Sequence, residues 1–192
     1  MKSPENVLLI IRRSLGDVLA LSPVIDILTR RFPKVSIDLL VNEDTVAAAK
    51  LLHNINAIIP FDDKLSAKTS LGAMAMHVNI IRKIFRQYDL AISFTSNERS
   101  NIFACLAGRT SAGTRELSFS KNWWHRMLID YGYQNNRKRH ILENNTQALR
   151  SLGIPVDRVI LSARYSSDAK NKVQQILKDM AIERFIIFHP AG

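Results

Sequence analysis

The loop over residues 13–17 (Arg-Ser-Leu-Gly-Asp) carries residue types that could do chemistry. It follows the apolar run Val7–Arg12 and precedes a segment with helical spacing. A carboxylate such as Asp17 can act as a general base in a cleft, but aspartate is also a preferred residue at the start of a helix. Gly16 permits a positive φ or the close approach of a ligand to the backbone. From the residues alone, both interpretations of Asp17 remain open.

Three arginines follow predicted strands, namely Arg13, Arg99 and Arg115. The carboxyl ends of parallel strands meet at one edge of a sheet, so we expect these side chains near the same edge. Guanidinium groups there would suit phosphate or carboxylate groups, and the alternative is that they are solvated surface charges. We interpret the basic run over residues 137–139 as a solvated loop.

The sequence predicts no metal site and no cofactor. The five histidines have no ligand spacing, and a single cysteine, Cys105, excludes an internal disulfide and a cysteine-based zinc cluster. Neither a G-x-G-x-x-G nor a Walker A motif occurs, so a dinucleotide site is not expected. Cys105 fits a helix-packing role. His189 could approach a donor phosphate or simply pack.

The elements that must position these residues alternate along the chain. Continuous apolar runs predict strands, and apolar residues at helical spacing predict helices. The predicted strands are 7–12, 35–41, 57–61, 90–94, 110–113 and 185–188, and the predicted helices are 19–31, 43–52, 71–87, 100–107, 141–152 and 168–180. This order predicts an α/β fold of right-handed βαβ units, a Rossmann-like parallel sheet flanked by helices.

The domain boundary is predicted near the end of the chain. Residues 185–188 form an apolar run with no crossover helix after it in the 192 residues. We therefore expect residues 1–180 to form one domain and residues 181–192 to supply the first strand and loop of a second domain, truncated there.

The charge indicates an anionic partner. Lysine and arginine number 27 against 17 acidic residues, giving a net charge of +10. Such a balance favours nucleic acid, an acidic membrane surface or a phosphorylated substrate. No apolar run reaches the roughly 20 residues of a membrane span, and no signal peptide is recognisable, so we expect a cytoplasmic protein.

An aromatic and basic segment over residues 119–133 has two interpretations. Trp123 and Trp124 either pack on the domain or lie at a membrane interface, where tryptophan and basic residues are favoured together.

The order of short motifs resembles the N-terminal domain of the bacterial ADP-heptose:lipopolysaccharide heptosyltransferases, glycosyltransferase family nine. The resemblance begins with the segment 10–18, which ends in Gly16-Asp17-Val18. The other matching segments are 22–24, 32–33, 37–41, 88–90, 99–100, 106–108, 114–116, 144–153 and 188–190. Segments 42–45 and 123–126 most resemble the heptosyltransferase III branch.

The resemblance implies a GT-B architecture, in which this domain binds the acceptor and a second domain binds ADP-heptose. It implies inverting transfer of heptose to the phosphorylated lipopolysaccharide inner core, in the cytoplasm or peripherally at the inner membrane. It gives Asp17 the catalytic role, acceptor contacts to Arg13, Ser14, Gly16, Arg99 and Arg115, and a donor-side role to His189. We expect the isolated chain to be inactive.

The competing function is a non-catalytic basic module that binds anionic membrane or nucleic acid. A nucleic-acid binder would cluster its basic residues on one face, whereas here they are dispersed along the chain. We therefore expect no nucleic-acid partner.

Overall fold

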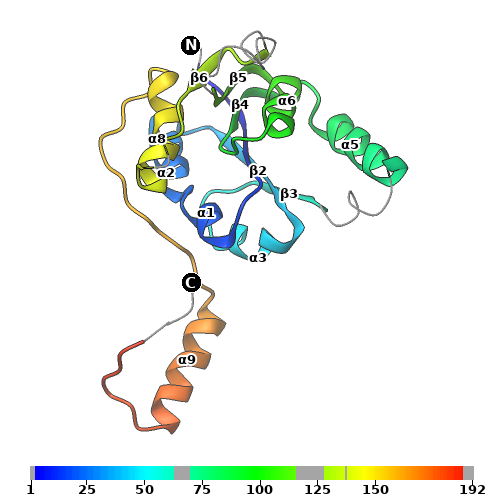
Figure 1. The fold of residues 1–192 in the computed structure, drawn as a ribbon. Coiled ribbons are helices and arrows are strands. Elements are labelled where there is room, and N and C mark those ends of the chain that lie inside the picture. The colour runs from blue at the N-terminus through cyan, green and yellow to red at the C-terminus, as the bar shows by residue number, and fades with distance from the viewer. Residues whose placement is uncertain (1–2, 63–69, 116–127, 137, 188–192) are drawn as a thin grey trace.

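A six-stranded parallel sheet forms the centre of the molecule (Figure 1). The computed structural model describes residues 3–62, 70–115, 128–136 and 138–187. The strands are β1 (Asn6–Ile11), β2 (Ser36–Asn42), β3 (Ala57–Phe61), β4 (Tyr88–Ser93), β5 (Gly108–Thr114) and β6 (Tyr131–Tyr133). Their order across the sheet is β3-β2-β1-β4-β5-β6, which confirms the predicted Rossmann-like sheet.

Strand β1 lies in the middle and is buried on both faces. Its Val7 is level with Ile37 of β2 on one side and with Leu90 of β4 on the other. Alternate side chains point to opposite faces of a strand, so Val7, Leu9 and Ile11 enter one core cluster while Leu8 and Ile10 enter the other. The continuous apolar sequence of β1 follows from this two-sided burial.

Helices cover both faces of the sheet. Helices α2 (Ser22–Arg31), α3 (Val46–Ala49) and α8 (Ile141–Ser151) contribute to the first core cluster, and α5 (Ser70–Ile84) and α6 (Glu98–Ala107) to the second. The remaining helical elements are α1 (Leu15–Leu19), the 3₁₀ turn η1 (Glu43–Thr45) and α9 (Ser167–Asp179).

Two predicted helices differ from the structure, and one strand was not predicted. The helix expected over 19–31 begins at Ser22 as α2, a separate short helix α1 precedes it, and Pro23, which has no N–H to donate, stands in the first turn of α2. The helix expected over 43–52 is the short pair η1 and α3. Strand β6 was not predicted, because three residues with two tyrosines and a glycine give no period-two pattern.

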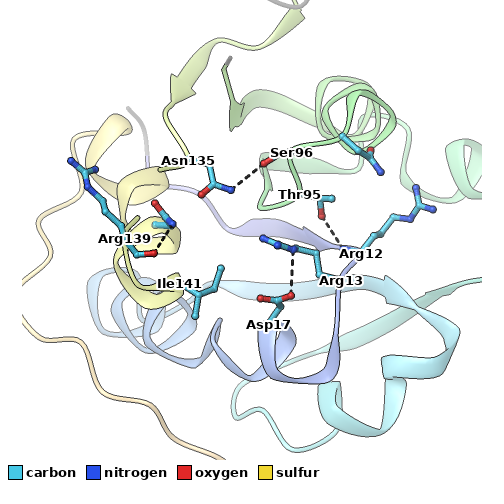
Figure 2. Close-up of a pocket in the computed structure, with 10 residues that line it drawn as sticks. Arg12, Arg13, Asp17, Thr95, Ser96, Asn135, Arg139 and Ile141 are labelled. Atoms are coloured by element: carbon cyan, nitrogen blue, oxygen red, sulfur yellow. Dashed lines mark hydrogen bonds and ion pairs between the residues drawn. The ribbon is translucent and has the colours of Figure 1, made fainter. Parts of the chain in front are cut away.

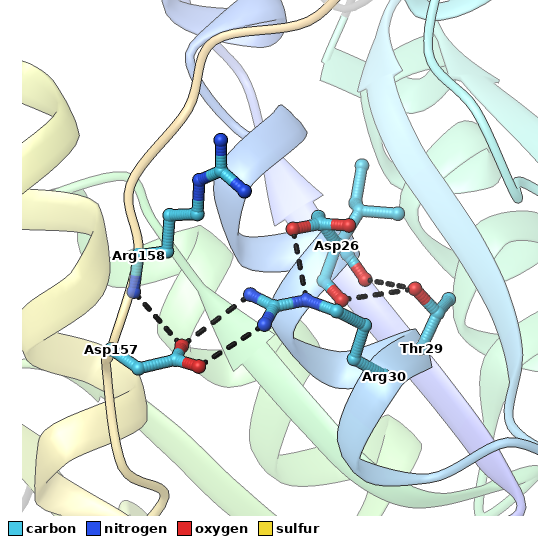
Figure 3. A network of polar contacts seen from close by, with 6 residues as sticks. Asp26, Thr29, Arg30, Asp157 and Arg158 are labelled. Carbon is cyan, nitrogen blue, oxygen red and sulfur yellow. Dashed lines mark hydrogen bonds and ion pairs between the residues drawn. The ribbon is translucent and has the colours of Figure 1, made fainter.

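The chain after α8 runs along the body as an extended strap, residues 155–166, and leads to α9, which projects away (Figure 1). Val156 of the strap packs against the first core cluster, and three polar contacts between described residues hold the rest. The Arg30 guanidinium binds the Asp157 carboxylate at 3.1 and 3.4 Å (Figure 3). The N–H of Ser162 donates to Ser22 Oγ at 2.9 Å, and that of Arg164 to the Leu51 carbonyl at 2.6 Å.

Residues 185–187 form no strand, contrary to the prediction for 185–188. Ile186 and Ile187 are 95% and 80% exposed. A strand is stable only beside a partner strand, and no described strand lies beside this segment. The proposed boundary at residue 180 therefore remains a prediction. Residue 188 lies outside the described residues.

Helix α9 buries none of its side chains. Its apolar residues Val173 and Ile176 are 53% and 48% exposed, and Met180 at its C-cap is 64% exposed. Within the described ranges no helix is long and apolar enough to cross a membrane.

Candidate functional site

A cleft of about 640 Å³ opens at the carboxyl ends of the strands (Figure 2). It lies where β1 and β4 meet, the point at which the strand order reverses direction and open α/β sheets bind their ligands. Ten residues line it: Arg12, Arg13, Asp17, Thr95, Ser96, Asn97, Asn135, Arg139, Ile141 and Asn144. Two of them, Arg13 and Asp17, belong to the loop that the sequence singled out.

Asp17 is held at this cleft by two neighbours. Its Oδ2 accepts a hydrogen bond from Ser14 Oγ at 2.9 Å and forms an ion pair with Arg13 Nε at 3.3 Å (Figure 2). The Asp17 side chain is 19% exposed and that of Arg13 is 38% exposed. Among the described residues no hydrogen bond reaches Oδ1, so one carboxylate oxygen is available to a ligand.

The helix-capping interpretation of Asp17 is wrong in its detail. Ser14 is the N-cap of α1, and Asp17 is the third residue of the helix. Asp17 still lies in the first turn, where a negative charge is favoured by the helix dipole. Because the cap position belongs to Ser14, capping does not explain the type of residue at position 17.

Gly16 does not have a positive φ, since Gly153 is the positive-φ glycine among the described residues. A Cβ added at Gly16 would meet nothing within 4 Å. The fold therefore does not require glycine at this position, and the space above its backbone is open to a ligand.

Arg12 is one of the residues that line the cleft, but its guanidinium contacts Asn42 and Phe61, which do not line it. Its Nε donates to Asn42 Oδ1 at 3.3 Å, and its Cζ lies 3.7 Å from the centre of the Phe61 ring. In Figure 2 the side chain points away from Asp17. The Arg12 N–H also donates to Thr95 Oγ1 at 2.9 Å. Arg12 thus joins the ends of β1, β2, β3 and β4 rather than serving the cleft as a free cation.

The opposite wall consists of neutral polar side chains. Thr95, Ser96 and Asn97 follow β4, and Asn135 Nδ2 donates to Ser96 Oγ at 3.0 Å. Sequence reasoning missed this group. The signal was present, because three consecutive polar residues follow a buried strand at the edge where ligands bind.

Asn144 fixes the loop before α8. Its Nδ2 donates to the carbonyls of Asn136 and Arg139 at 2.9 and 3.3 Å, and its Oδ1 accepts from the Asn136 N–H at 3.1 Å. The side chain is buried. It holds the loop that brings Asn135 and Arg139 to the cleft.

Lys138 and Arg139 lie in an exposed turn, as predicted for a solvated loop, and Arg139 has a further place at the cleft. It lines the cleft and pairs with Glu143 at 3.7 Å. Lys138 is exposed, and residue 137 lies outside the described residues.

Arg99 and Arg115 are not brought into the cleft. Arg99 is exposed in the first turn of α6 and is not among the lining residues. Arg115 folds over β6, where its Nη2 donates to the Ile129 carbonyl at 2.8 Å and its side chain lies against Gly132. An acceptor contact by either remains a prediction. His189, Trp123 and Trp124 lie outside the described residues.

No cluster of metal-ligating side chains occurs in the described parts of the chain. His77 packs between Phe61 and Phe103, with ring centroids 5.4 and 5.9 Å apart. Burial raises the pKa of the Cys105 thiol, which opposes a nucleophilic role. The cleft chemistry therefore rests on one carboxylate, cations and neutral hydrogen-bonding groups.

The chain is 24% identical over 187 residues to lipopolysaccharide heptosyltransferase 3 of Escherichia coli K12, covering 92% of this chain and 51% of that protein. The resemblance to the heptosyltransferases is confirmed. The chain spans about half the length of the curated relative that it matches. No family model matches the sequence.

Solved heptosyltransferase structures share the fold. A family 9 glycosyl transferase from Veillonella parvula aligns with a TM-score of 0.74 at 18% identity, covering 92% of this chain and 49% of that one. The E. coli heptosyltransferase WaaC, solved with ADP-2-deoxy-2-fluoro heptose, aligns at 0.68 and 17% identity, covering 81% and 51%. The architecture of this chain is therefore that of one Rossmann-like half of a GT-B protein.

Proposed function

We propose that this chain is the acceptor-binding half of an inverting glycosyltransferase that moves heptose from ADP-heptose to the phosphorylated inner core of lipopolysaccharide. The observation that carries the proposal is Asp17, the one carboxylate among the described residues lining the cleft, with Oδ1 available. The similarity to heptosyltransferase 3 supports the enzyme over a non-catalytic basic module for membrane or nucleic acid.

The proposed step needs a single base. Asp17 Oδ1 takes the proton of the acceptor hydroxyl, the hydroxyl oxygen bonds to the anomeric carbon, and the bond from that carbon to ADP breaks with its electron pair leaving on ADP. Displacement from the face opposite ADP inverts the anomeric centre. Ser14 and Arg13 hold Oδ2, so Oδ1 is the oxygen placed to act.

The acceptor would lie across the cleft. Gly16 leaves room for it above α1, and Ser96, Asn97 and Asn135 offer neutral hydrogen-bonding groups to sugar hydroxyls on the other wall. Ser14 and Arg13 would contact it beside Asp17. The mixture of one base, cations and amides suits an anionic sugar.

The donor contacts belong to a second domain in this proposal. Residues 181–192, including His189, would start that domain, and the exposed apolar residues 185–187 would form a strand within its sheet. The coding sequence beyond Gly192 tests this directly: a second Rossmann-like half with a phosphate-binding loop is expected there, and its absence would contradict the proposed architecture.

We further propose that the protein works at the cytoplasmic face of the inner membrane, with no cofactor and no nucleic-acid partner. The net charge of +10 supports contact with acidic lipid, and Trp123 and Trp124 are the residues proposed for it. Co-sedimentation with liposomes of acidic lipid should weaken when both tryptophans are replaced by alanine. Equal binding by the double variant would remove this part of the proposal.

The deciding experiment replaces Asp17 by Asn in the protein extended through its second half. Asn keeps the shape of the side chain but takes up no proton, so transfer of heptose should fall by about a thousandfold or more. Circular dichroism and the thermal midpoint should stay close to wild type. Transfer at the wild-type rate would reject Asp17 as the base. Residues 1–192 alone should show acceptor binding and no transfer.

A further inference from the structure

Arg13 is the cation at the centre of the cleft, and its guanidinium is only partly used. Nε makes the closest approach to Asp17, at 3.3 Å, and the side chain remains 38% exposed. Among the described residues, Asp17 is the one polar side chain paired with it. A guanidinium carries five N–H donors arranged in a fork, so the two Nη groups retain donors for an oxyanion.

Of the other arginines of the cleft, Arg12 is bound to Asn42 and covers the Phe61 ring. Arg139, on the loop before α8, pairs with Glu143 at 3.7 Å, and Arg13 is the arginine whose ion pair is with Asp17 itself. The opposite wall adds neutral donors, of which Ser96, Asn97 and Asn135 line the cleft. An anion that binds beside Asp17 therefore has Arg13 as its adjacent cation, with the hydroxyl and amide groups of the other wall facing it.

We propose that Arg13 binds a phosphate-type oxyanion of the substrate through its Nη groups while Nε keeps its contact with Asp17. One side chain then fixes both the base and the anionic group, and the reacting hydroxyl must be a near neighbour of that group. This inference rests on the proposed function and deepens it, because it names the chemical group that stands beside the reacting hydroxyl.

The first test measures the binding of inorganic phosphate to the chain by NMR titration at low ionic strength. Wild type should bind saturably at one site, and Arg13→Gln should weaken binding by about tenfold, the loss expected for a charge-assisted hydrogen-bonded pair. Arg13→Lys should weaken it too, since a single ammonium cannot face Asp17 and the anion as a fork does. Unchanged binding by Arg13→Gln would overturn the inference.

Two further variants make the test specific. Asp17→Asn removes the negative charge next to the site, so phosphate should bind about fourfold more tightly. Arg150→Gln is the matched control, because this exposed arginine in the last turn of α8 lies at the far end from the cleft-lining Ile141. Its phosphate affinity should stay at the wild-type value. An equal loss in Arg150→Gln and Arg13→Gln would show a general charge effect and overturn the site.

Two probes distinguish the sources of the oxyanion. Glycerol 2-phosphate stands for a phosphate monoester on an acceptor, and ADP stands for the diphosphate of a donor. Dependence of either affinity on Arg13 supports the site and identifies its source, and independence of both overturns it. Because these measurements involve no sugar transfer, a failed transfer assay with an intact Arg13 dependence would count against the proposed function alone.

Discussion

At the residue scale, the structure corrects the helix-cap interpretation of Asp17 and leaves its catalytic role a proposal. Ser14 occupies the cap position, and Asp17 lies in the first turn of α1 with Oδ2 held by Ser14 and Arg13. The sequence predicted the loop, because a glycine and an aspartate after a buried strand stand where ligands bind. It could not predict that Arg13 and Ser14 both approach Oδ2, since that depends on rotamers.

Gly16 offers a prediction that separates stability from function. Gly16→Ala should leave the free energy of unfolding unchanged or raise it by about 0.5–1 kcal/mol, because the added Cβ meets nothing and alanine favours a helix. Acceptor binding should weaken, since the methyl group occupies the open space. Chemical denaturation and acceptor titration measure the two effects. Unaltered acceptor affinity would show that no ligand approaches Gly16.

Tyr133 is a buried structural group whose ionisation should destabilise the fold at high pH. Its hydroxyl donates to the Ser93 carbonyl at 2.7 Å, and burial raises its pKa above the ordinary value of 10.0. The protonated form is the one that the fold stabilises, so this stability is complete below pH 10.0 and is lost as pH rises beyond it.

The variant Tyr133→Phe tests this linkage. At pH 7 it should lose about 1–2 kcal/mol of stability, because the Ser93 carbonyl loses its donor. Between pH 10 and 12 its stability should fall less steeply than that of wild type. Urea unfolding at several pH values gives both quantities. Parallel pH profiles for the two proteins would exclude Tyr133 as a contributor.

At the element scale, the long buried strands and amphipathic helices were predictable, whereas short elements were not. The apolar runs of β1 and β4 are buried only when each strand lies between two neighbouring strands and is covered by helices on both faces. Strand β6 is held in part by one backbone hydrogen bond, in which the N–H of Arg115, the residue after β5, donates to the Tyr133 carbonyl of β6 at 2.8 Å. Such tertiary support leaves no periodic signal in three residues.

The junction of α6 and β5 should not tolerate a side chain at Gly108. A Cβ there would meet the carbonyl oxygen of Thr110 and lie 2.9 Å from the Ala91 nitrogen, both of them backbone atoms that cannot turn aside. Gly108→Ala should therefore lower the free energy of unfolding by about 1–3 kcal/mol. Gly16→Ala is the matched control, and equal stabilities for the two variants would contradict this close approach.

At the scale of the whole molecule, the strap over residues 155–166 connects the sheet domain to α9. Its ion pair joins exposed side chains, Arg30 and Asp157, and the Arg30 hydrogen bond lowers the pKa of the Asp157 carboxyl. The contact is therefore present above the ordinary pKa of aspartate and lost as pH falls below it. No sequence pattern indicated a pair separated by 127 positions.

Asp157→Asn should loosen the strap without unfolding the domain. Hydrogen exchange should accelerate at the amides of Arg158, Ser162 and Arg164, while the amides of β1 keep their protection. Added salt should reproduce the effect in wild type, because exposed ion pairs are screened. Unchanged exchange along the strap would show that the Ser162 and Arg164 backbone contacts suffice.

The central position of β1 has a consequence for synthesis of the chain. β1 leaves the ribosome first, but its neighbours follow in two stages, β2 by residue 42 and β4 only by residue 93. For about fifty residues of translation, one edge of the strand that carries the apolar run Val7–Ile11 therefore lacks its pairing partner. An unpaired apolar edge invites association with other nascent chains. The interval between β2 and β4 is accordingly where we expect molecular chaperones to engage this protein.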